Sequence, residues 1–215
     1  MSQDAELADQ LGPHPLGQMV LRLFPKGDVL ATYRQEMFER QTRRAELLRA
    51  ELSASAETAQ AVFERLNEDP SAGDLFTEAL RIAIESGYEF KIRMLGRIVV
   101  DATLSEDSAA IDLGALLVRT VKDLEPLDVR GLMAARRRRV RPGEHGVKDI
   151  LGVDRAAQEA IFANLVRHGL LHVANEENPE QRYWRVGPYG KLLIRLLERA
   201  GVTPDNFEAA LAARI

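Results

Sequence analysis

The first strong pattern along the chain is a long stretch of helix-forming residues from Val29 to Asn67. It contains no glycine or proline, and alanine, glutamate, arginine, glutamine and leucine dominate it, which are residues of high helix propensity. A continuous helix of about 38 residues is roughly 57 Å long. Nine positions alternate in spacings of three and four, as the seam of a coiled coil does. They are Phe38, Gln41, Ala45, Leu48, Leu52, Ser55, Ala59, Val62 and Leu66.

This seam has two interpretations. It can pair with the same seam of a second chain, which makes residues 29–67 the contact of a homo-oligomer such as a coiled-coil dimer. It can also pack against the rest of its own chain. Seven of the nine positions are apolar, but Gln41 and Ser55 interrupt the apolar surface, so the sequence leaves both interpretations open.

Three shorter amphipathic segments follow the long one. Apolar residues at spacings of three and four predict helices over 71–86, 88–104 and 111–124. Ser71, with Asp74 three residues later, is a candidate N-cap for the first of them. Residues 29–125 are therefore predicted to be helical with short connections.

The pattern changes after residue 125, where a basic run and two short apolar segments appear. The two segments alternate in polarity and are joined by a polar loop, which predicts a β-hairpin. The predicted order is a helix from Pro126, a basic run at 136–141, a short helix at 146–151, a longer helix at 154–168, a hairpin of 170–174 and 183–186, and a helix from Pro188.

This order of elements, together with two stretches of residues, resembles the winged helix-turn-helix superfamily. Leu165 to Leu171 looks like the end of a recognition helix that runs into the first wing strand. Tyr183 to Leu193 is similar to the second strand and following helix of many bacterial transcription regulators. The resemblance implies a mainly α fold, with a helical region that contains one long helix, followed by a winged helix-turn-helix with a small β-hairpin. The expected regions are a flexible lead-in (1–28), the helical region (29–125), the winged-helix domain (126–200) and a C-terminal helical tail (201–215).

A weaker resemblance concerns the layout of the chain. Residues 74–190 run through two helices, the Leu124–Asp128 segment and the winged-helix-like unit. This is similar to the layout of abortive-infection alpha-type proteins, which occur in bacterial antiphage and prophage settings. Because winged helices also dock proteins, the resemblance supports an alternative function, a non-enzymatic adaptor or effector that binds a protein partner.

The distribution of charged residues along the chain is more informative than the net charge of the whole chain. The 215 residues carry 29 Lys and Arg against 33 Asp and Glu, a net charge of −4, which by itself disfavours nucleic acid as a partner. Residues 1–125 hold 14 basic and 22 acidic side chains, whereas residues 126–200 hold 14 and 9. The basic C-terminal third is therefore consistent with a transcriptional regulator that binds DNA.

If the protein binds DNA, the helix at 154–168 is expected to lie in the major groove. Its candidates for base contacts are Arg155, Gln158 and Asn164, whose side chains suit guanine or adenine edges. Glu159 and the acidic loop at 175–182 oppose DNA binding, because they repel phosphates. The candidates for phosphate contacts are Arg136, Arg137, Arg138, Arg139, Arg141, Lys148, Arg182 and Arg185.

The sequence shows no catalytic or metal-binding motif. It has no cysteine, which excludes disulfides and thiolate sites, and its four histidines are scattered. We therefore expect neither an enzyme nor a bound cofactor or metal. No apolar stretch is long enough to span a membrane, and the N-terminus lacks the pattern of a secretion signal, so we expect a cytoplasmic protein that does not bind membranes.

Overall fold

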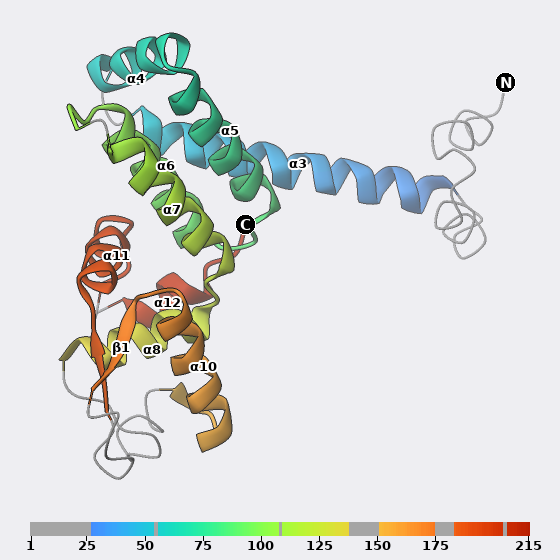
Figure 1. Ribbon diagram of the computed structural model, residues 1–215. Coiled ribbons are helices and arrows are strands. Elements are labelled where there is room, and N and C mark those ends of the chain that lie inside the picture. Colours follow the sequence, from blue (N-terminus) through green and yellow to red (C-terminus); the bar gives the residue numbers. More distant parts are fainter. Residues whose placement is uncertain (1–26, 54–55, 108, 138–150, 175–182, 204–205) are drawn as a thin grey trace, which may run out of the picture. The chain divides into compact units, whose positions relative to one another are not determined.

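The computed structural model describes residues 27–53, 56–107, 109–137, 151–174, 183–203 and 206–215 (Figure 1). The predictions for the lead-in before residue 27, for the basic run after Arg137, for most of the short helix at 146–151 and for the loop at 175–182 lie outside the described residues. The chain divides into two compact units, residues 1–43 and residues 44–215.

In the first unit, the described residues belong to helix α3, which spans Gly27–Leu52 and continues into the second unit. The side chains between 35 and 43 are almost all exposed, and Phe38 is 70% exposed. Arg40 forms an ion pair with Glu36 at 3.5 Å. Helix propensity and i,i+4 pairs therefore favour the helix here.

The second unit is mainly helical and contains a small two-stranded antiparallel sheet. In the sheet, Leu171 pairs with Val186 and Ala174 pairs with Tyr183. None of the described helices is both long and apolar enough to cross a membrane. After α3 the elements are α4 (Ala56–Glu68), α5 (Pro70–Glu85), α6 (Glu89–Thr103), α7 (Ala110–Asp123), α8 (Pro126–Arg137), α10 (Arg155–Arg167), β1 (Leu171–Ala174), β2 (Tyr183–Val186), α11 (Pro188–Arg199) and α12 (Phe207–Ala212).

The prediction of one uninterrupted helix over 29–67 is wrong. Helix α3 ends at Leu52, and Ser53 lies in a turn in which its amide donates to the Arg49 carbonyl at 3.0 Å. Serine favours such ends because it competes for backbone hydrogen bonds. The break places two seam positions, Leu48 on α3 and Val62 on α4, in buried sites of the second unit. This part of the seam therefore packs against its own chain.

Helices α5, α6, α7 and α10 begin and end within one residue of their predicted bounds. In the predicted helical tail at 201–215, helix α12 spans Phe207–Ala212. The start of α5 shows why small shifts occur. Asp69, and not the predicted Ser71, is the N-cap, and its carboxylate accepts a hydrogen bond from the Ser71 amide at 2.9 Å. Pro70 occupies the first turn, where its missing amide proton costs nothing. Further along, Asp154 caps α10 as predicted.

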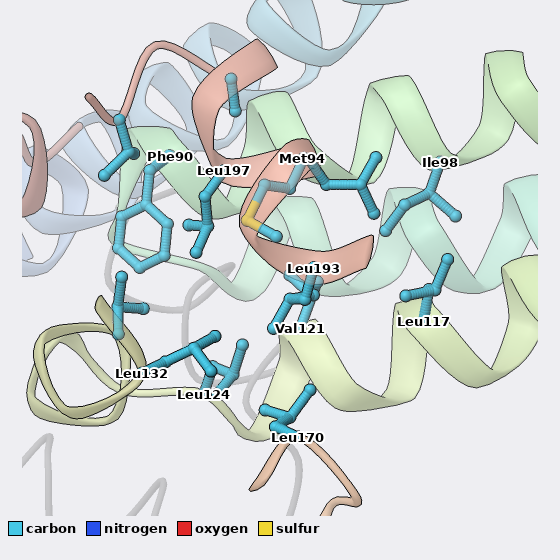
Figure 2. Packing of buried hydrophobic residues seen from close by; sticks show 14 of the residues in the cluster. Phe90, Met94, Ile98, Leu117, Val121, Leu124, Leu132, Leu170, Leu193 and Leu197 are labelled. Atoms are coloured by element: carbon cyan, nitrogen blue, oxygen red, sulfur yellow. The ribbon is translucent and has the colours of Figure 1, made fainter. Parts of the chain in front are cut away.

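The core of the second unit is one hydrophobic cluster centred on α6. Figure 2 shows three α6 side chains, Phe90, Met94 and Ile98, surrounded by residues of α7 and α11 and by Leu132 and Leu170. Full burial of each large apolar side chain contributes about 1.5–3 kcal/mol. The cluster contains residues from both sides of Pro126, so the predicted helical region and the C-terminal third share a core.

Candidate nucleic-acid interface

Helices α8 and α10 and the hairpin are packed tightly together. A side chain at Gly131 of α8 would meet Ile161 of α10, because a Cβ there would lie 2.8 Å from the Ile161 Cγ2 atom. Phe162 of α10 stacks on Trp184 of β2, with ring centroids 4.6 Å apart and planes 17° apart. Both rings are buried. The hairpin is thus held on α10 by an aromatic pair of the offset-stacked kind that strengthens packing beyond its area.

Gln158, a predicted base contact, points into the protein. Its side chain is only 1% exposed, and its Nε2 donates to the Val153 carbonyl at 2.9 Å. Within the described part of the chain its Oε1 has no hydrogen-bond partner. The sequence carries a signal for this burial, because Gln158 precedes Ile161 and Leu165 by three and seven residues and so shares their apolar stripe.

Asn164, another predicted base contact, links two helices. Its Nδ2 donates to Asp128 Oδ1 at 3.1 Å, and its Oδ1 accepts from Arg167 at 2.7 Å. Asp128 is buried, and its other oxygen accepts the Glu125 amide at 2.9 Å at the start of α8. Asn164 therefore ties α10 to the first turn of α8.

Arg155 lies on the outer face of α10, with its side chain 70% exposed, and forms an ion pair with Glu159 at 3.0 Å. An exposed i,i+4 pair of this kind contributes only about 0.3–0.5 kcal/mol, so Arg155 can leave it to meet another anion. The other exposed residues of α10 are three alanines, Ala156, Ala160 and Ala163, and Arg167 at its end.

The described residues among the predicted phosphate contacts lie on two different elements, α8 and β2. Arg136 forms an ion pair with Glu198 of α11, and Arg137 is the last residue of α8. Arg185 is exposed on β2, opposite His172. Because Trp184 faces α10 and side chains alternate along a strand, Arg185 lies on the other face of the hairpin. The remaining candidates, Arg138, Arg139, Arg141, Lys148 and Arg182, lie outside the described residues.

The positive excess of residues 126–200 lies entirely in their described part. There, nine Lys and Arg stand against four Asp and Glu. Several of the nine are paired; Arg130 with Glu208 and Arg199 with Asp101 are examples. The hydrogen bonds that Arg199 donates to the Asp101 carboxylate raise the pKa of Arg199. Among these nine, the exposed cations with no carboxylate partner in the described residues are Arg167, Arg185, Lys191 and Arg195.

Three of these four cations, Arg167, Lys191 and Arg195, were missed as site residues from the sequence. The signal for them is their position opposite the apolar stripes of α10 and α11. Comparison of the chain with protein-family models, with curated proteins and with solved structures found no match.

Proposed function

We propose that this protein is a winged helix-turn-helix DNA-binding protein that acts as a transcriptional regulator in the cytoplasm. The order of α8, α10, β1 and β2 supports this function, as does the packing of α10 on α8 and of the hairpin on α10. In this arrangement α10 takes the place of the recognition helix and β1 and β2 form the wing.

The observation that carries the proposal is the pair of exposed arginines that flank this unit without carboxylate partners in the described residues. Arg167 lies at the end of α10 and Arg185 lies on the wing. Such cations bind phosphates by releasing counterions, which gives affinity but no sequence information. The sequence predicts further phosphate contacts after Arg137 and at Arg182, which lie outside the described residues.

The internal hydrogen bonds of Gln158 and Asn164 determine the kind of binding that we propose. Because both amides bond within the protein, base reading is left to Arg155, which has to leave Glu159 to reach a guanine. We therefore propose DNA binding that depends mainly on phosphate contacts, with a strong salt dependence and a modest sequence preference.

The first experiment measures duplex DNA binding by fluorescence anisotropy between about 50 and 200 mM salt. The logarithm of the affinity should fall with the logarithm of salt concentration, with a slope of about −0.9 for each phosphate contact. A triple variant, Arg137→Ala/Arg138→Ala/Arg139→Ala, leaves the Arg136–Glu198 ion pair intact. It should reduce the slope by about 2.7 if all three side chains contact phosphates. Absence of DNA binding at the lowest salt concentration contradicts the proposed function.

One observation favours a second candidate function, the docking of a protein partner. The outer face of α10 offers small alanines beside an ion pair, and small side chains let another chain approach closely. The variant Ala160→Glu separates the two functions. With α10 in the major groove, the new carboxylate should weaken DNA binding at least about tenfold, because it faces phosphates. If DNA affinity is unchanged, α10 does not face DNA, and docking is the better account of this helix.

A further inference from the structure

An apolar groove lies between helices α7 and α11, outside the proposed DNA-binding unit. Each helix contributes a stripe at positions i, i+3 and i+7, which fall on one face of a helix. A contact between Thr120 Oγ1 and Tyr189 Oη, 2.9 Å apart, shows that the two stripes face each other. Burial raises the pKa of the Tyr189 hydroxyl. The stripes are Leu113, Leu116 and Thr120 on α7, and Tyr189, Leu192 and Leu196 on α11.

The groove opens into a cavity of about 300 Å³ towards the start of α7. Ile98, Ala102 and Leu117 line it from α6 and α7, and its lining also includes the polar residues Asp101, Ser105 and Asp107. Leu113 is 42% exposed and Leu116 is 50% exposed. Single exposed leucines are ordinary, but two leucines one turn apart beside this cavity form a patch of the kind that marks interaction sites.

The two walls of the groove carry opposite charges. On α7, Asp112 and Asp123 are exposed, and neither has a cation partner among the described residues. On α11, Lys191 and Arg195 are exposed, and neither has a carboxylate partner among them. The groove thus has an acidic wall on α7 and a basic wall on α11.

The exposed cations of α7 are Arg119 and Lys122. The pKa of Glu78, a residue of α5, is lowered mainly by its hydrogen bond with Arg81, and the charges of Lys122 and Arg119 lower it further. Arg119 follows Asp112 by seven residues and precedes Asp123 by four, so it lies on the same face of α7 as both carboxylates. With two carboxylates and one arginine, this wall keeps a net negative charge.

We propose that a second copy of this chain covers the groove and that the protein is a homodimer through α7 and α11. A twofold axis through the groove places α7 of each copy over α11 of the other, as the self-complementary contact of a twofold dimer requires. The acidic wall of each copy then faces the basic wall of the other copy, so the dimer contains this contact twice. The exposed leucines of both copies pack at the centre. A helix with a uniformly acidic or basic surface fits less well, because one wall repels it.

This contact differs from the predicted coiled coil through residues 29–67, part of which packs into its own chain at Leu48 and Val62. Phe38 remains as an exposed seam position in the first unit. The proposed dimer is independent of the proposed DNA binding, since its test measures molecular mass without DNA.

The experiment measures the mass of the full chain by sedimentation velocity and light scattering. The wild-type chain of 24.0 kDa should form a particle of twice that mass. Two variants reverse one wall each, Asp112→Lys/Asp123→Lys and Lys191→Glu/Arg195→Glu. Each alone should dimerise at least about tenfold more weakly, because like-charged walls then face each other. An equimolar mixture of the two should recover a heterodimer with wild-type affinity or better.

The apolar centre is tested by Leu113→Ser/Leu116→Ser, with Phe38→Ser as the matched control outside the groove. The first variant should be a monomer with an unchanged far-ultraviolet circular dichroism spectrum, since both leucines are substantially exposed. The control should remain a dimer. A wild-type monomer at all concentrations overturns the proposal, as does a dimer that survives both wall reversals or dissociates only with Phe38→Ser.

Discussion

Helices α10 and α11 lie in the same C-terminal third, yet they place their polar residues in opposite ways. Helix α10 turns Gln158 and Asn164 inward, where they bond to the backbone and to Asp128. Helix α11 turns Lys191 and Arg195 outward. The amides of Gln158 and Asn164, which suit base contacts, thus form hydrogen bonds within the protein. Lys191 and Arg195, which were not predicted as site residues, are exposed and can bind a partner.

The difference follows from how strictly each helix separates apolar from polar positions. In α11, Leu193, Ile194 and Leu197 fill the buried side and leave the charges outside. In α10 the Gln158 amide occupies a buried position, where its Nε2 donates to the Val153 carbonyl. The type of a side chain therefore identifies a binding residue only together with its place on the helix.

The largest expected effect comes from removing the aromatic contact between α10 and the hairpin. Phe162→Ala should lower the free energy of unfolding by about 3–5 kcal/mol, because it leaves a cavity against Trp184. Urea unfolding followed by circular dichroism measures this change. A loss below about 1 kcal/mol would show that the inner side of α10 is not held as described.

The inward amide of α10 is tested by Asn164→Ala. The variant leaves the buried Asp128 Oδ1 without its partner, which should cost about 1–3 kcal/mol of stability. DNA affinity, measured where the variant is fully folded, should not change. A stable variant with weaker DNA binding would instead assign Asn164 to base contact, as the sequence alone suggested.

Replacement of the exposed cations of α11 should change partner binding and leave stability nearly unchanged. Lys191→Ala/Arg195→Ala should leave stability within about 0.5 kcal/mol of wild type and weaken dimerisation. The salt slope of DNA binding per chain should stay the same, because the groove uses these side chains. A slope reduced by about 1.8 would instead show that both side chains contact DNA phosphates.

The smallest effect is expected at the exposed ion pair of α10. Arg155→Ala should reduce stability by no more than about 0.5 kcal/mol, because the pair with Glu159 is exposed to solvent. Its effect should appear in sequence preference, compared by competition between guanine-containing and guanine-free duplexes. An unchanged preference would remove Arg155 from the base-contact candidates.

Most elements of the fold could be predicted from the sequence, because apolar spacing, Asp154 and Pro126 mark helices clearly. The break between α3 and α4 could not be predicted in the same way, since the stretch contains no glycine or proline and the preference of Ser53 for a helix end is weak. The direction of Gln158 was readable from its spacing, but its chemistry suggested the opposite role. The groove depends on α7 and α11 meeting in space, which no local pattern encodes.

The most direct test of the proposed DNA-binding surface compares two variants of equal charge change. Arg167→Ala/Arg185→Ala removes the free arginines of α10 and the wing, and Arg65→Ala/Arg81→Ala removes paired arginines of α4 and α5. Salt titrations of DNA affinity should show the slope reduced by about 1.8 for the first variant and unchanged for the second. Equal changes for both variants would mean that only overall charge matters, and would contradict a defined surface at α10 and the wing.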